Sequence, residues 1–217
     1  MNTFISYASD IKKTAGRIKE YLDKYGFNCF LAHEDIPPQT EWPAEILKAL
    51  EKCDLFLPLL TPGFITSFFC QQETGFAYCR DVEILPIMIS KAPMGMIANK
   101  QALRFNKKQF EISCWKIVKH VAKNTSLSEP VLDALIKEFG ESGTYDDACD
   151  WAEKILNEFR FTRRQIKEIK NHIKNNSQIN ETKKARDTIF QFMKKYPSFF
   201  DDDFVKLYDR KSRTHMR

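Results

Sequence analysis

The segment Leu55-Phe56-Leu57-Pro58-Leu59-Leu60 is the longest uninterrupted run of apolar residues in this chain of 217. Six residues are too few to cross a bilayer as a helix, which takes about 20. The run contains no polar residue that would face solvent from one side of a sheet. Strands of this composition are covered on both faces, as in a parallel sheet between two layers of helices. The segment therefore predicts an α/β fold.

The residues on both sides of this run repeat the same rhythm. Short apolar strings at Phe4–Tyr7, Phe27–Leu31 and Ile84–Ile89 are typical of further strands. Ser9 or Asp10 is expected to cap the helix that follows the first string, and Gly26 to end it. Apolar residues recur at helical spacing between the strings, over residues 12–25, 43–50, 67–79 and 114–121. This alternation predicts a flavodoxin-like parallel sheet flanked by helices, over residues 1–125.

Residues 128–217 show helical spacing only, in four or five segments separated by short polar turns. We predict a smaller all-α module there, with a regulatory or assembly role. Residues 160–217 carry a net charge of +9, whereas residues 1–159 carry −4. We interpret the positive charge as a solvated helical face and do not expect nucleic acid as a partner.

The composition restricts the class of protein further. Apolar residues make up 43% and charged residues 29%, as in a folded globular protein. We find no signal peptide and no membrane span, so we expect a cytoplasmic protein without a membrane partner. The six cysteines form no Cys-x-x-Cys pair and the four histidines no ligand spacing, so we expect reduced thiols and no metal.

Neither a dinucleotide fingerprint rich in glycine nor a phosphate-binding loop is present in the sequence. A phosphorylated receiver domain has a similar strand rhythm, but it needs an acceptor Asp after the third strand. Thr61-Pro62-Gly63 stands at that place, so we exclude this alternative.

Three segments are expected to meet at the carboxyl edge of the sheet, where ligands of such folds bind. The first is Phe4-Ile5-Ser6-Tyr7-Ala8-Ser9, and the second is the loop of residues 30–42 with Asp35, Ile36 and Trp42. The third is Ser67-Phe68-Phe69-Cys70-Gln71-Gln72-Glu73, which opens a helix. In this order they resemble the Toll/interleukin-1 receptor (TIR) domain in its bacterial form, over about residues 2–123.

The resemblance implies an activity and a set of site residues. Bacterial TIR domains commonly cleave NAD between nicotinamide and ribose, and their catalytic glutamate matches Glu73. The resemblance further implies substrate contacts, at Ser6, Tyr7, Ser9, Asp35, Ile36, Trp42 and Phe69. NAD is the substrate, and no separate cofactor is expected. Asp35 and Ser9 have structural alternatives, as a turn residue and a helix cap.

One carboxylate suffices for this chemistry. The ring nitrogen of bound nicotinamide is already cationic, so the base leaves as a neutral molecule without an acid. Positive charge develops on the ribose, as in glycosidases, and a carboxylate in a water-poor cleft stabilises it. The residues alone do not distinguish a linear ADP-ribose product from a cyclic one.

The resemblance also implies partners. TIR domains of this kind self-associate, often act in antiphage defence, and in some systems make an ADP-ribose signal for a downstream effector. Two alternatives remain open. One is a non-catalytic adaptor that works through TIR–TIR contacts, and the more remote one is a nucleoside ribosyl transferase.

Overall fold

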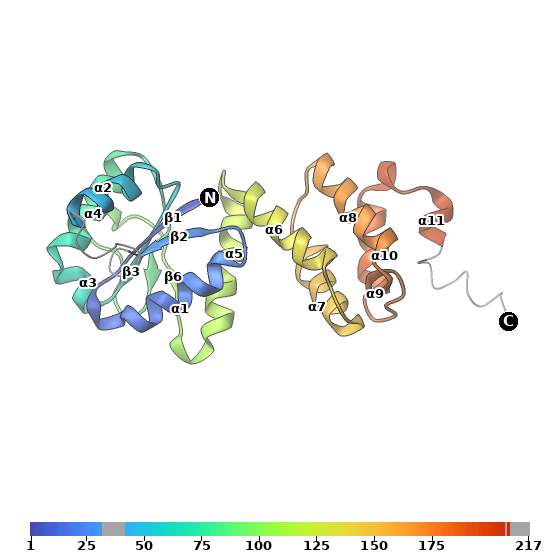
Figure 1. Cartoon of the computed structure of the whole chain (residues 1–217), viewed down its shortest axis with the longest axis horizontal. Helices are drawn as coiled ribbons and strands as arrows, with labels where there is room; N and C mark the ends of the chain where they lie inside the picture. Colours follow the sequence, from blue (N-terminus) through green and yellow to red (C-terminus); the bar gives the residue numbers. More distant parts are fainter. Residues whose placement is uncertain (32–41, 207, 209–217) are drawn as a thin grey trace. The chain divides into compact units, whose positions relative to one another are not determined.

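Figure 1 shows the computed structural model, which describes residues 1–31, 42–206 and 208. The chain divides into two compact units, Met1–Val131 and Leu132–Arg217. The division falls inside helix α6 (Ser128–Gly140). The domain roles given above, for residues 1–125 and 128–217, stay predictions.

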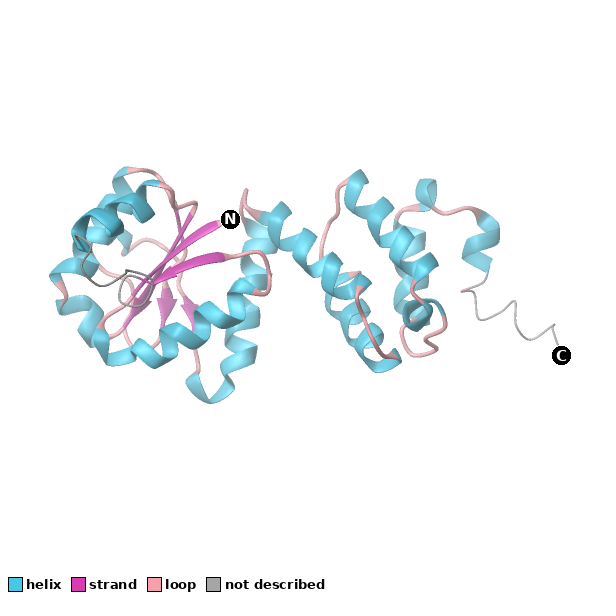
Figure 2. Ribbon diagram, in the orientation of Figure 1, coloured by secondary structure: helices cyan, strands magenta, loops and turns pink. Residues whose placement is uncertain are grey.

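A parallel sheet forms the centre of the first unit (Figure 2). Its strands lie in the order β2-β1-β3-β5-β6, and β4 also pairs with β3. Every recorded pair is parallel. The strands are β1 (Asn2–Ser6), β2 (Asn28–Leu31), β3 (Leu55–Leu60), β4 (Glu83–Ile84), β5 (Ile87–Met88) and β6 (Leu103–Arg104). The predicted α/β class, a parallel sheet flanked by helices, is confirmed.

Helices cover both faces of this sheet, because its strands place apolar side chains alternately on either side. Phe4, Phe56 and Leu60 share one core cluster with side chains of α2 and α4. On the other face, Ala15, Ile18 and Leu22 of α1 are buried, as are Ile117 and Val121 of α5. The helical segments are η1 (Ser9–Ile11), α1 (Lys12–Asp23), α2 (Trp42–Glu51), α3 (Pro62–Thr66), α4 (Phe68–Cys79), η2 (Gly95–Ile97), η3 (Lys107–Gln109) and α5 (Phe110–Asn124).

The start of the first helix differs from expectation, and its end does not. The chain enters the short 3-10 turn η1 before α1, so Ser9 and Asp10 lie inside a helical turn instead of preceding one. Neither caps α1, whose N-cap residue Ile11 has no side-chain cap. Gly26 has φ of 81°, the left-handed conformation predicted for the residue that ends this helical segment.

The predicted strand Ile84–Ile89 is interrupted in the structure. β4 ends at Ile84 and β5 begins at Ile87, so Leu85 and Pro86 separate them. The register places Pro58 of β3 beside this interruption, with Phe56 paired to Ile84 and Leu59 to Ile87. Neither proline has an N–H to donate to the ladder, which explains the break.

Two side chains of α1 form hydrogen bonds with the backbone of the edge strand β2. The Cys29 N–H donates to Asp23 Oδ1 at 2.8 Å, and Lys19 Nζ donates to the Cys29 carbonyl. Lys19 and Asp23 also form an ion pair at 3.5 Å, one helical turn apart. The outward donor and acceptor of this strand residue are therefore both bonded within the chain.

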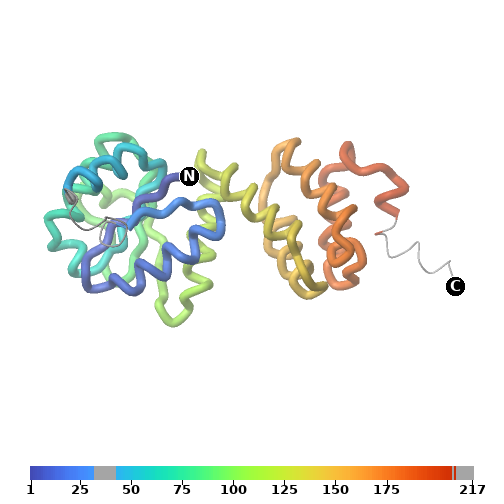
Figure 3. Tube along the Cα trace, in the orientation of Figure 1, coloured from blue at the N-terminus to red at the C-terminus, as the bar shows by residue number. Residues whose placement is uncertain are grey.

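The second unit is helical throughout its described part. Figure 3 follows its helices along the chain, from yellow to red. Thr162 and Gln165 form a reciprocal capping box at the start of α8. Phe192 is fully buried among the rings of Phe161, Tyr196 and Phe200. After α6, the segments are α7 (Tyr145–Ile155), α8 (Arg163–Asn175), α9 (Ser177–Asn180), α10 (Arg186–Lys195), η4 (Pro197–Phe199) and α11 (Asp202–Lys206).

Candidate functional site

A cavity of about 370 Å³ lies at the carboxyl edge of the sheet, where β1 ends at Ser6. Parallel strands end on the same side of a sheet, so the segments that follow β1 and β3 meet there. The cavity is lined by residues at and after the end of β1, by α3 and by the first half of α4. They are Ile5, Tyr7, Ala8, Ser9, Asp10, Gly63, Thr66, Ser67, Phe69, Cys70 and Glu73. Its size suits a small organic ligand or one part of a larger one.

Helix α4 carries a glutamate on the face that packs against the sheet. Ser67 caps the helix by accepting a hydrogen bond from the Cys70 N–H at 3.3 Å. The buried residues of α4 follow at helical spacing, and they are Cys70, Glu73, Thr74 and Ala77. Glu73 is only 7% exposed, at a position where this spacing calls for an apolar side chain. Such an exception to the pattern marks a candidate functional residue.

Ser6 holds the carboxylate of Glu73. The alternation of β1 places Ser6 on the same face of the sheet as Phe4, toward α4. The buried Ser6 hydroxyl donates to Glu73 Oε2 at 2.5 Å. Among the described residues, no other hydrogen-bond partner of this carboxylate is recorded. The pair joins the end of the central strand β1 to the middle of α4.

Burial dominates the electrostatics of Glu73. Removal from water raises the pKa of its carboxyl group from 4.5 to about 7, although the bond from Ser6 acts in the opposite direction. The group therefore changes charge close to neutral pH. An ionised carboxylate in this position stabilises positive charge that develops in the cavity.

The structure brings four of the predicted site residues to one cavity. Tyr7, Ser9, Phe69 and Glu73 all line it. Phe69 lies one turn before Glu73 and is 52% exposed, so its ring stands partly in solvent beside the cavity. Ser6 contributes its bond to Glu73 and is not among the lining residues. Asp35 and Ile36 lie outside the described residues, and Trp42 is placed by its backbone only, as the first residue of α2.

Sequence reasoning did not predict Asp10, Gly63 or Thr66 as lining residues. Asp10 was predicted to cap a helix, and the motif of the third segment predicted only Phe69 and Glu73 as site residues. Asp10 follows the end of β1 by four residues, so its place at the carboxyl edge was available as a signal. Gly63 gives no such signal, because its contribution is the lack of a side chain.

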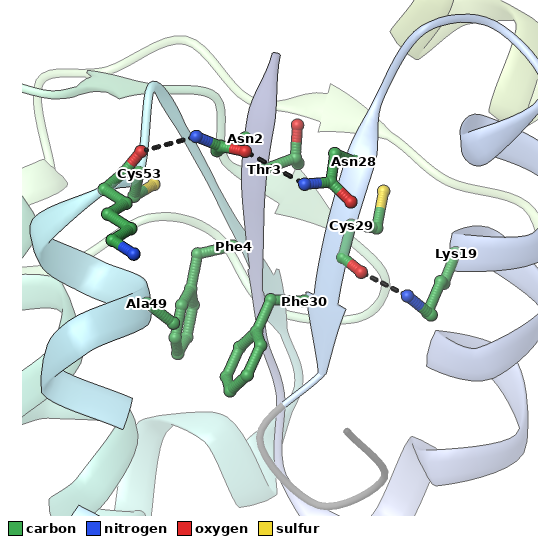
Figure 4. A pocket seen from close by; sticks show the side chains of 10 residues that line it. Asn2, Thr3, Phe4, Lys19, Asn28, Cys29, Phe30, Ala49 and Cys53 are labelled. Atoms are coloured by element: carbon green, nitrogen blue, oxygen red, sulfur yellow. Dashed lines mark hydrogen bonds between the residues drawn. The ribbon is translucent and has the colours of Figure 1, made fainter. Parts of the chain in front are cut away.

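A second cavity of about 330 Å³ lies at the opposite, amino end of β1 and β2 (Figure 4). The rings of Phe4 and Phe30 lie there, 5.3 Å apart between centroids. Asn2 bridges the other polar groups, since it donates to the Lys52 carbonyl and accepts from Asn28. No acidic side chain lines this cavity within the described part of the chain. We therefore place the candidate site at the cavity that holds Glu73.

Two other kinds of feature are absent from the part of the chain that the structure describes. No helix there is long and apolar enough to span a membrane. No group of three or more His, Cys, Asp or Glu side chains there could hold a metal ion.

The sheet order and the buried carboxylate at its carboxyl edge define a class, a flavodoxin-like α/β domain with a candidate charge-stabilising site. A family profile described as "TIR domain" matches residues 3–117, more than half of the chain. The chain therefore belongs to the TIR domain family.

One solved structure similar to this chain is the crystal structure of the TIR domain of the Toll-related receptor TRR-2 from Hydra magnipapillata. The two share 18% sequence identity with a TM-score of 0.46, over 54% of this chain and 94% of that one. No curated protein matches the chain.

Proposed function

We propose that this chain cleaves NAD at the bond between nicotinamide and ribose, with Glu73 as the catalytic residue. The observation that carries the proposal is the buried Glu73 carboxylate, which faces a cavity at the carboxyl edge and is held by Ser6. Some members of the TIR domain family cleave NAD, whereas others act as adaptors in signalling. The carboxylate favours the first group for this chain.

The chemistry needs one charged group at the reacting carbon. The bond between the ribose C1′ and the nicotinamide nitrogen breaks, and its electron pair neutralises the ring nitrogen. The ribose is left with oxocarbenium character, which the Glu73 carboxylate stabilises across the cavity. A water oxygen then bonds to C1′ and releases a proton, giving ADP-ribose. Attack by the adenine of the same molecule instead gives a cyclic product.

The biological setting belongs to the proposal as well. TIR domains generally associate with one another, and we propose that self-association activates this chain in the cytoplasm. An antiphage role, with an effector that responds to the ADP-ribose product, fits such an activity. The helical second unit is then an assembly or sensing element. Two of its lysines bond within the unit, Lys170 to the Phe199 carbonyl and Lys195 to the Phe159 carbonyl.

The test is mass spectrometry of NAD after incubation with purified full-length protein over a range of concentrations. We expect free nicotinamide with linear or cyclic ADP-ribose from the wild type. Glu73→Ala and Glu73→Gln should lower the rate by at least about 100-fold, as loss of a group that stabilises transition-state charge does. The matched control is Glu20→Gln, on the exposed side of α1, which should keep the wild-type rate.

A specific observation favours the adaptor as second candidate. Phe68 is 85% exposed at the start of α4, beside the half-exposed Phe69. Exposed rings at one helix end are typical of a contact surface. If the wild type leaves NAD intact at every protein concentration, the enzyme proposal is wrong and the adaptor stands. Parallel incubation with deoxynucleosides tests the ribosyl transferase.

A further inference from the structure

A second acidic residue, Asp10 of η1, lines the same cavity as Glu73. Asp10 also lines two neighbouring hollows, one with Thr61 and Phe105 and one along the start of α1. Asp10 therefore borders all three hollows at the carboxyl edge of the sheet. Glu73 is buried, whereas Asp10 is exposed. Two carboxylates in such different surroundings are suited to different tasks.

The hydroxyl of Thr61 orients the Asp10 carboxylate. Thr61 is 2% exposed and caps α3, because its Oγ1 accepts from the Phe64 N–H at 3.2 Å. The hydroxyl proton then remains to donate, and Asp10 Oδ1 lies 3.2 Å away. Among the described residues no hydrogen bond to the other oxygen, Oδ2, is recorded, so that oxygen can accept from a ligand.

Gly63 makes room for this carboxylate. A Cβ at position 63 would lie 2.9 Å from Asp10 Cγ, 3.0 Å from Oδ1 and 3.1 Å from the Ala8 Cβ. These separations are too short for nonbonded atoms, so any side chain here would displace Asp10. The position of Asp10 therefore depends on Gly63 on one side and on Thr61 on another.

We propose that Asp10 binds the hydroxyl groups of the ribose whose positive charge Glu73 stabilises. Asp10 thereby selects ribonucleotide substrates. The inference rests on the proposed NAD chemistry. A carboxylate accepts hydrogen bonds from adjacent sugar hydroxyls, as acidic residues do for ribose in dinucleotide sites. Asp10 and Glu73 line one cavity of about 370 Å³, so a ribose that lies against Glu73 shares this cavity with Asp10. Asp10 positions the ribose while Glu73 stabilises its charge.

The experiment measures binding in a background that does not turn over. Glu73→Gln protein is titrated by calorimetry with NAD and with the analogue that carries 2′-deoxyribose on the nicotinamide side. We expect the analogue to bind about 10- to 100-fold more weakly, because a hydrogen bond to a charged group is lost. With Asp10→Asn added, NAD should bind as weakly as the analogue, and the two ligands should differ by less than about twofold.

Two further variants keep the inference falsifiable. Gly63→Ala should weaken NAD binding in the same direction without removing the carboxylate. Asp81→Asn, at the far end of α4, should leave both affinities unchanged, and thermal melts verify folding of each variant. The inference is overturned if no variant binds NAD, or if Asp10→Asn still distinguishes the two ligands.

This outcome is separable from that of the proposed function. Suppose that NAD binding depends on the ribose 2′-hydroxyl and on Asp10, but the wild type does not cleave NAD. This result supports the role of Asp10 and contradicts the proposed enzyme activity. Suppose instead that the wild type cleaves NAD, and that Asp10→Asn still distinguishes NAD from the deoxyribose analogue. This result supports the proposed enzyme activity and contradicts the role of Asp10.

Discussion

Burial of Glu73 in the folded chain favours the protonated form of its carboxyl group over the ionised form. Because burial raises its pKa from 4.5 to about 7, the folded chain holds a proton there that the unfolded chain has released over this interval. The stabilisation is complete below pH 4.5 and is lost as the pH rises to about 7. The loss is on the order of 3 kcal/mol, since each pH unit corresponds to about 1.4 kcal/mol.

We therefore expect Glu73→Gln to stabilise the protein at pH 8 and to have almost no effect at pH 4. The amide removes the buried charge and still accepts from Ser6 through its oxygen. Thermal melts of both proteins across this pH range measure the difference. A variant that is less stable than the wild type at pH 8 would show that the carboxylate is solvated in the folded state.

Ser6 gives a second prediction at the scale of the residue. Its hydroxyl favours the ionised form of Glu73, so its removal raises the pKa of that carboxyl group further. We expect Ser6→Ala to move the acid limb of the NAD cleavage profile to higher pH, by about 0.5 to 1 pH unit. Ser126→Ala, in the exposed turn before α6, is the control and should leave the profile in place. If the pH profile of NAD cleavage is unchanged in Ser6→Ala, Ser6 does not influence the ionisation of Glu73.

Strand and helix elements show which parts of the fold could be predicted from the sequence. Leu55–Leu60 was predicted with its observed ends, because a run that is apolar on both faces specifies its own burial. The two-residue strand β6 was missed, since two residues carry no period. The five-residue helix α3 was missed because its capping sequence Thr61-Pro62-Gly63 is also a common turn sequence.

The candidate site was predictable to the same extent. Glu73 and Ser6 follow from a motif and from the alternation of a strand. Their 2.5 Å bond could not be predicted, because it depends on how α4 packs across β1. The place of Asp10 depends in turn on Gly63, fifty-three positions along the chain, and local sequence contains no record of such a contact.

The contact of α6 with α8 gives a prediction at the scale of the element. Gly140 ends α6 against the His172 ring, and a Cβ there would lie 2.3 Å from two ring atoms. We expect Gly140→Ala to destabilise the helical unit by about 2 kcal/mol through overpacking. Gly143→Ala is the matched control, because its Cβ would meet nothing within 4 Å.

Urea denaturation followed by circular dichroism measures both glycine variants. Adding His172→Ala to Gly140→Ala should restore part of the lost stability, since the overlap is relieved. Equal stability of the two glycine variants would contradict the observed packing.

The distribution of thiols gives a prediction for the whole molecule. All six cysteines are free, and five are buried while Cys79 is exposed at the end of α4. Burial also raises the pKa of Cys53 to about 11 and that of Cys114 to about 12, so these thiols are protonated and unreactive at neutral pH. A thiol reagent should label one cysteine rapidly in the native protein and the other five only after unfolding. Mass spectrometry of labelled peptides identifies the site, and Cys79→Ser should abolish the rapid phase.

The Lys19–Asp23 pair on strand β2 has a consequence for any higher assembly of the chain. A polypeptide strand added beside β2 could not form hydrogen bonds with the Cys29 backbone, because side chains of α1 already bond to both its N–H and its carbonyl. Fibre growth by successive strand addition is blocked at that margin. We therefore expect a second copy of the chain to contact this side of the domain through helices and loops, and not by adding a strand beside Cys29.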